Sequence, residues 1–114
     1  MANIRNPSSI IGKTVNATAT AGTSTILNNN EGSTVVYKVN SIFAANIDGA
    51  NSSWISVQVA NYYIARYIIV PPDSTQIIST KETYFYLENG QSIFTQAQTN
   101  GDVHVVISYE KITN

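Results

Sequence analysis

The chain has 114 residues, a net charge of −1, 11% charged residues and no cysteine. These values exclude a disulfide framework and a thiolate zinc site, and they give no basic patch for nucleic acid. No stretch reaches the length of a membrane span, and the first residues lack the apolar segment of a signal peptide, so we expect neither.

Residues 1–11 differ from the rest of the chain. Asparagine, proline and serine make the segment prone to turns, while Ile4, Ile10 and Ile11 are apolar. Two interpretations stand side by side: a poorly ordered terminus, or an arm that docks its isoleucines on a neighbouring subunit. Residues 12–114 form one domain by length.

Period-two alternation of apolar and polar residues, which is the signal of a β-strand, dominates the domain. Over residues 34–46 it predicts a long strand, or two strands with a bulge. One face of that strand would carry Val35, Tyr37, Val39, Ser41, Phe43 and Ala45. Over 54–60 it places Ile55, Val57 and Val59 on one face. Residues 65–70 are apolar on both faces, which predicts a more fully buried strand.

The last third continues the pattern. In residues 83–87 alternation sends Phe85 and Leu87 to one face and Tyr84 and Tyr86 to the other. The final strand carries Val103, Val105, Ile107 and Tyr109 on its inner face. Asn89-Gly90 predicts a hairpin turn, and Asn100-Gly101 introduces the last strand. Many short strands with turns between them predict an all-β, single-domain antiparallel β-sandwich of the jelly-roll type.

Exposed aromatic residues are the main candidates for function. Tyrosine buries a large area and keeps a polar tip, so it is enriched at interfaces. Aromatic packing within the sheet and a sugar-stacking platform are the alternatives. The candidate interface residues are Ile4, Ile10, Ile11, Tyr62, Tyr63, Tyr67, Tyr84 and Tyr86.

Catalytic and metal chemistry have little support. Nearly all of the acidic residues lie in turns or at strand ends, and His104 has no nucleophile motif near it. The loop 48–52 lacks the ligand spacing of a calcium site. We therefore expect no enzyme activity, no catalytic or metal-binding residues and no cofactor.

Four segments resemble small β-sandwich virion proteins of tailed bacteriophages, notably those of aquatic and cyanobacterial phages. They are the opening MANIRNPSSIIGKT (1–14), VYKVNSIFAANIDGANSSWISVQV (36–59), VPPDSTQIISTKETYFYLENGQSI (70–93) and VHVVISYEKI (103–112). Together they cover most of the chain, and they are structural patterns without a shared active site.

The resemblance implies a non-enzymatic virion component, made in the host bacterial cytoplasm. Such proteins decorate the capsid, or serve as neck, tail-fibre or adaptor parts, commonly as trimers or other symmetric oligomers. The implied partners are further copies of the chain and phage capsid or tail proteins, without nucleic acid or membrane. A receptor- or glycan-binding module is the alternative, with residues 47–54 or 61–63 as binding loops.

Overall fold

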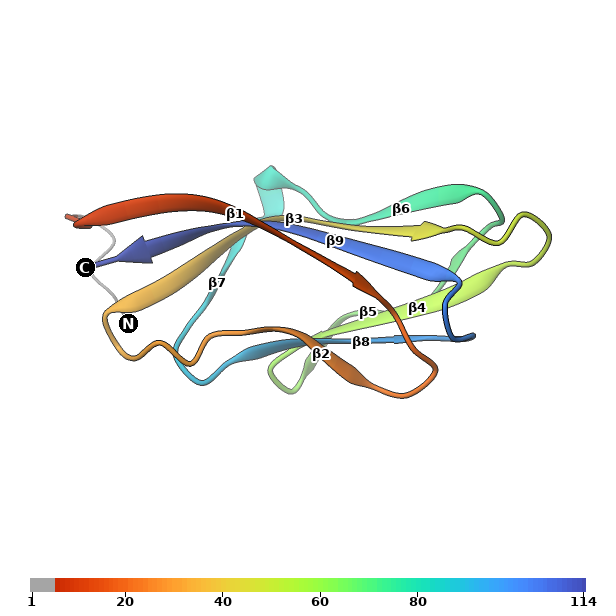
Figure 1. Cartoon of the computed structure of the whole chain (residues 1–114), viewed down its shortest axis with the longest axis horizontal. Helices are drawn as coiled ribbons and strands as arrows, with labels where there is room; N and C mark the ends of the chain where they lie inside the picture. The colour runs from red at the N-terminus through yellow and green to blue at the C-terminus, as the bar shows by residue number, and fades with distance from the viewer. Residues whose placement is uncertain (1–5) are drawn as a thin grey trace.

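The computed structural model describes residues 6–114, and this part of the chain is an elongated body of 49 × 22 × 18 Å. The described residues form nine strands and a 3₁₀ helix, η1 (Lys81–Thr83), and the strands lie in two layers (Figure 1). The strands are β1 (Ser9–Thr18), β2 (Ser24–Asn28), β3 (Val35–Asn46), β4 (Ser53–Val59), β5 (Tyr62–Val70), β6 (Ser74–Ser79), β7 (Phe85–Leu87), β8 (Ser92–Ala97) and β9 (Val103–Thr113).

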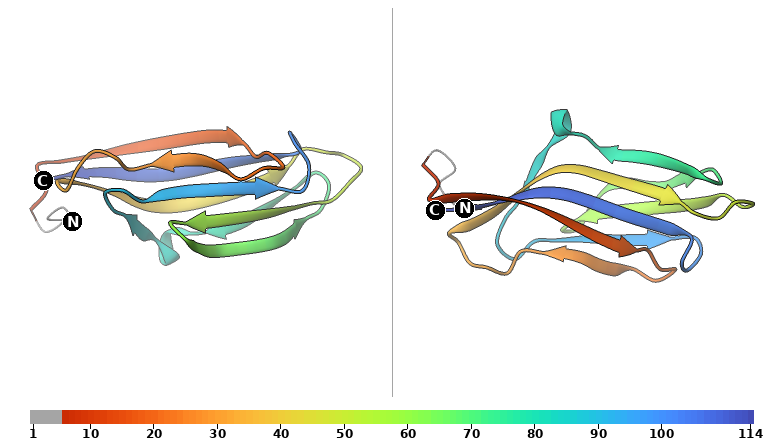
Figure 2. Two further views of the ribbon diagram at one scale, coloured as in Figure 1. Left: turned by 90° about the horizontal axis from the view of Figure 1, so that it is seen from below. Right: turned by 45° about the horizontal axis from the view of Figure 1, so that its top comes forward.

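The strands form two antiparallel sheets that face each other (Figure 2). Sheet A has the order β1-β9-β3-β6, and β7 pairs with β3 beyond the end of β6. Sheet B has the order β2-β8-β4-β5. The chain passes from one sheet to the other at most of its connections, which is the winding of a jelly roll. The predicted fold class, a single-domain all-β sandwich, is confirmed.

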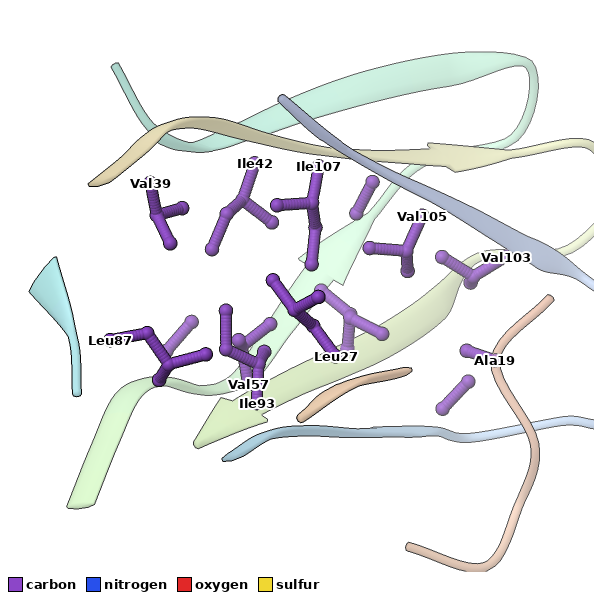
Figure 3. Close-up of a cluster of buried hydrophobic side chains, with 14 of the residues drawn as sticks. Ala19, Leu27, Val39, Ile42, Val57, Leu87, Ile93, Val103, Val105 and Ile107 are labelled. Carbon is purple, nitrogen blue, oxygen red and sulfur yellow. The ribbon is translucent and has the colours of Figure 1, made fainter. Parts of the chain in front are cut away.

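The core lies between the sheets, where branched aliphatic side chains from both layers meet (Figure 3). Sheet A contributes Val103, Val105 and Ile107, and sheet B contributes Ile55 and Val57, all at most 1% exposed. Alternation therefore predicted the inward faces of β4 and β9 correctly. Such side chains each stabilise the fold by about 1.5–3 kcal/mol when fully buried.

Strand β3 is one strand with a bulge, and the bulge changes which face its second half presents. Val39 pairs with Tyr109 and Ser41 with Ser108, so Asn40 is an extra residue on β3. An extra residue inverts the alternation that follows it. The core therefore receives Ile42 and Ala44, and the prediction that Ser41, Phe43 and Ala45 share the face of Val35 is wrong.

Strand β5 is an edge strand, which corrects the prediction that residues 65–70 form a fully buried strand. Only Ala65 and Val70 are buried, whereas Tyr67 and Ile69 are more than half exposed. The register against β4 shifts twice along β5. An apolar strand at a sheet edge exposes side chains that a central strand would bury.

The Asn89-Gly90 turn is not a hairpin, because β7 belongs to sheet A and β8 to sheet B. The Asn100-Gly101 turn likewise carries the chain from sheet B to sheet A. Both glycines have positive φ, +85° and +86°, as their turns require. A tight hairpin occurs instead between β4 and β5, where Val59 pairs with Tyr62 and Ala60 has φ +54°.

Two buried asparagines fix crossings between the sheets. Asn29 donates from Nδ2 to the carbonyl oxygens of Val35 (3.2 Å) and Leu87 (2.9 Å), and its Oδ1 accepts from the Glu31 amide. Asn46 donates to the carbonyl oxygens of Asn51 (2.9 Å) and Val70 (3.0 Å). Each side chain thus bonds to backbone groups of other segments, which satisfies its own amide in the interior and ties those segments together.

The last residues of the segment called an arm from the sequence, 9–11, belong to sheet A. Strand β1 starts at Ser9, and Ile10 and Ile11 pair with Ile112 and Lys111 of β9 in the same chain. Both isoleucine side chains remain at least half exposed. Ile4 lies outside the described residues.

Candidate functional site

The outer face of the β4–β5 hairpin gathers aromatic side chains around one arginine. On β4, Trp54 points away from the core because its neighbour Ile55 points into it. The indole packs edge-on against the Tyr67 ring, with centroids 4.7 Å apart and planes at 74°. Ile69 pairs with Trp54 in the sheet register.

A strained bulge holds Tyr67 in this position. Its φ is +52°, a left-handed conformation that costs a residue with a side chain about 1–2 kcal/mol. The Tyr67 amide donates to Ser56 Oγ (3.0 Å) instead of joining the regular ladder. Bulges re-aim side chains and are frequent beside functional sites, and strain of this kind persists where surrounding contacts impose it.

Arg66 joins the two exposed tyrosines of this face. Its guanidinium lies 5.0 Å from the centre of the Tyr63 ring and 5.2 Å from that of Tyr67. Cation–π contacts of this kind contribute about 0.5–1 kcal/mol at exposed sites. They also hold a long side chain in one conformation, which lowers the entropy lost when a partner binds.

We call the set Trp54, Tyr63, Arg66, Tyr67 and Ile69 the β5 aromatic surface. Tyr63, Tyr67 and Ile69 are 46%, 52% and 57% exposed. From typical side-chain areas these three present roughly 300 Å² of mostly apolar surface, in the range of the largest patch on a monomer. Trp, Tyr and Arg are also the residue types that dominate binding energy at interfaces.

Tyr62 belongs to a different feature, although it is adjacent in sequence to Tyr63. It borders a groove of about 470 Å³ between the β4–β5 hairpin and β7, together with Ile64, Phe85, Glu88 and Gln91. The groove combines apolar walls with one carboxylate. Alternation along β5 therefore divides the predicted tyrosine cluster between the outer face and this groove.

Tyr84 and Tyr86 lie on the outer face of sheet A, as alternation predicted, with Phe85 and Leu87 turned to the core. Their rings meet edge-on at 5.7 Å, and Lys38 Nζ lies 4.4 Å from the centre of the Tyr84 ring. Tyr86 packs on Val36 and Ile112. These tyrosines thus pack largely within their own sheet, and Tyr84 stays 46% exposed.

The titratable groups support loops rather than converging on a reaction centre. Glu31 pairs with Lys111 and accepts a hydrogen bond from the Tyr37 hydroxyl, and these contacts lower the pKa of its carboxyl. Burial, followed by the bond to Glu31, raises the pKa of Tyr37. Hydrogen bonds from the amides of Ala50 and Asn51 lower the pKa of Asp48, which caps its own turn.

Within residues 6–114, no group of three or more acidic or histidine side chains could hold a metal ion. His104 is exposed on β9 and lines a shallow hollow of about 350 Å³ with residues 16–18. No helix in the described part of the chain is long and apolar enough to cross a bilayer.

A prediction follows for the Glu31 contacts. Because the folded state lowers this pKa, the pair stabilises the protein above the ordinary carboxyl value of 4.5, and the contribution is lost as the pH falls through the lowered value. We expect Glu31→Gln to reduce the free energy of unfolding at pH 7 by about 0.5 kcal/mol, since the pair is partly exposed.

The measurement is urea unfolding between pH 3 and pH 7. The difference between wild type and Glu31→Gln should shrink towards pH 3. Glu82→Gln, an exposed carboxylate on η1, serves as the control. A difference that stays constant across this range would contradict the assignment.

Comparison with known proteins gives a structural likeness but no sequence match. No family model and no curated protein sequence matches the chain. A solved structure, described as Bacillus endospore appendages that form a novel family of disulfide-linked pili, superposes with a TM-score of 0.50. The match covers 99% of this chain and 96% of that chain, at 12% sequence identity. At this identity the likeness shows a shared fold.

Proposed function

We propose that the protein is a non-enzymatic structural component that binds other proteins in a repeated assembly. In its most specific form, it is a component of a tailed-phage virion, and it decorates the capsid by binding the shell as a symmetric oligomer. The β5 aromatic surface is the observation that carries the proposal. It presents Trp, Tyr and Arg side chains in a prearranged cluster, at the cost of a strained backbone at Tyr67.

The fold and the composition are compatible with this role. The jelly roll recurs in viral capsid proteins, and the four sequence segments resemble phage virion proteins. The structural neighbour is a pilus, which is also a protein assembly. Those pili are described as disulfide-linked, whereas this chain has no cysteine, so contacts between its copies would form without disulfides. Repeated weak contacts suffice in a symmetric shell because avidity multiplies them.

A neck, tail-fibre or adaptor position is the closest alternative, because the same surfaces would serve there. A glycan-binding module is the second candidate, favoured by the groove at Tyr62 with Glu88 and Gln91 at its border. The β5 aromatic surface fits a sugar less well, because Arg66 lies over two of its rings.

The test is the absolute mass in solution, followed by binding to particles. We expect light scattering to give a multiple of the 12.4 kDa chain mass, and mass spectrometry to find the protein in purified virions of the encoding phage. A monomer at high concentration that binds no particles would overturn the proposal. Sugar-dependent NMR shifts at Tyr62 in that monomer would favour glycan binding.

A further inference from the structure

Strand β1 is the one long, regular edge strand in the described part of the chain. Edge strands present unpaired backbone groups, and proteins normally blunt them with bulges, prolines, charges or short length. Strands β2, β5 and β6 each show a register shift, and β7 has three residues. In contrast, β1 pairs with β9 over ten consecutive residues without a shift, and it contains no proline.

The register identifies which groups of β1 face the open edge. The Ala19 amide donates to the Val103 carbonyl oxygen (2.8 Å), in the same register as the ladder. In an antiparallel pair every second residue bonds to the neighbouring strand, so the odd-numbered residues of β1 bond to β9. The open edge therefore presents the amides and carbonyls of Ile10, Gly12, Thr14, Asn16 and Thr18.

Gly12 has no explanation within its own chain. Its φ is not positive, and a side chain placed there would meet nothing within 4 Å. A glycine in the interior of a strand weakens it, and where no bulge or bend is present it is typical of a site that another backbone or a ligand approaches closely. Gly12 is the second of the five residues that face the open edge, and it is itself exposed.

We propose that β1 pairs antiparallel with β1 of a second copy about a two-fold axis at Thr14, so that sheet A continues across the contact. Gly12 then lies opposite Asn16 of the second copy, and Ile10 lies opposite Thr18. The five outward residues exchange about ten hydrogen bonds, a typical number for an interface. The inference deepens the proposed self-assembly and rests on it.

Charge and the number of paired residues favour this register over its two neighbours. With the axis at Thr14, Lys13 lies opposite Val15, and Ile11 lies opposite Ala17. An axis at Lys13 would place two lysines directly opposite each other, which is destabilising. An axis at Val15 would leave Ile10 unpaired. A two-fold contact gives a dimer by itself, and it joins two trimers into a hexamer where a three-fold contact is also present.

The absence of native cysteine allows a direct test by oxidative cross-linking. Opposed residues in a hydrogen-bonded pair have Cα atoms about 5.5 Å apart, within the 4.4–6.8 Å that a disulfide spans. We expect Thr14→Cys to give a covalent dimer on a non-reducing gel after copper-catalysed oxidation. The residue is exposed, so the substitution preserves the core.

Gly12→Cys and Asn16→Cys are the matched controls. In a dimer of either variant alone, the two introduced sulfur atoms lie about 13 Å apart, because residue 12 of one copy is displaced along the strands by four positions from residue 12 of the other, and the same holds for residue 16. A mixture of the two variants should cross-link as a heterodimer. No dimer from Thr14→Cys, or equal dimer from each single variant, would overturn the register. An oligomeric wild type without Thr14 cross-linking would leave the proposed function standing and reject this contact.

Discussion

Replacing Asn29 by alanine should lower the free energy of unfolding by about 3 kcal/mol, because the buried side-chain bonds to the carbonyl oxygens of Val35 and Leu87 and to the Glu31 amide are all lost. Asn29 ties the loop after β2 to both β3 and β7, so the substitution removes bonds that link three segments. Urea unfolding followed by tryptophan fluorescence of Trp54 gives the measurement. Since the free energy of unfolding of a domain is about 5–15 kcal/mol, the variant should remain folded at low temperature without denaturant.

Asn30→Ala is the matched control, since Asn30 is the exposed neighbour of the same type. It should change the unfolding free energy by less than about 0.5 kcal/mol. Equal effects at positions 29 and 30 would mean that the side-chain bonds of Asn29 contribute nothing beyond a change of loop composition.

Removing the Tyr67 side chain should weaken self-association or partner binding about thirty-fold, which corresponds to a loss of about 2 kcal/mol at the centre of an interface. Two variants separate binding from backbone strain. Tyr67→Ala keeps a side chain on a residue with the left-handed φ of +52°, so the backbone strain remains. Tyr67→Gly removes that strain, because glycine adopts a positive φ without steric cost. We expect both variants to lose association, and the glycine variant to be more stable than the alanine variant by about 1 kcal/mol.

Phe43→Ala is the control for this experiment, because Phe43 is an exposed aromatic residue on sheet A, outside the β5 aromatic surface. Association can be followed by analytical ultracentrifugation across a concentration series, and stability by urea unfolding. If Tyr67→Ala associates as the wild type does, the β5 aromatic surface is not the interface.

Sequence alternation predicted the faces of the strands that lack bulges. On β4, Ile55 and Val57 point inward as the pattern requires, and on β9 so do Val103, Val105 and Ile107. It predicted a possible bulge between residues 34 and 46 but not its position. One extra residue, Asn40, was enough to exchange Phe43 for Ile42 in the core. A bulge depends on pairing with another strand, which a local pattern does not contain.

The same limit applies to the turns. Asn89-Gly90 has the chemistry of a hairpin, and the structure uses its positive φ for a passage between sheets. Turn chemistry determines a local change of direction. Which sheet the next strand joins depends on where its apolar face can be buried. Residues 65–70 show this as well, because an apolar composition does not distinguish a central strand from an edge strand with exposed apolar side chains.

The candidate site was predicted in part. Tyr63 and Tyr67 were named from the sequence, but Trp54, Arg66 and Ile69 were missed as their neighbours. Alternation alone separates residues 66 and 67 onto opposite faces. The bulge at Tyr67 brings both side chains to the outer face, where Arg66 contacts two tyrosine rings. The signal that could have indicated the cluster is the lone arginine within an apolar, aromatic segment.

The pairing of β1 with β9 has a consequence for synthesis of the protein. The first strand of the sandwich has its neighbour at the far end of the domain, so sheet A cannot close until Thr113 has left the ribosome. Contacts between distant segments also slow folding. In a chain truncated before β9, β1 would have no partner strand, and the core would lack Val103, Val105 and Ile107. Sheet A, including the paired β1 strand at its edge, therefore forms only on chains translated through β9.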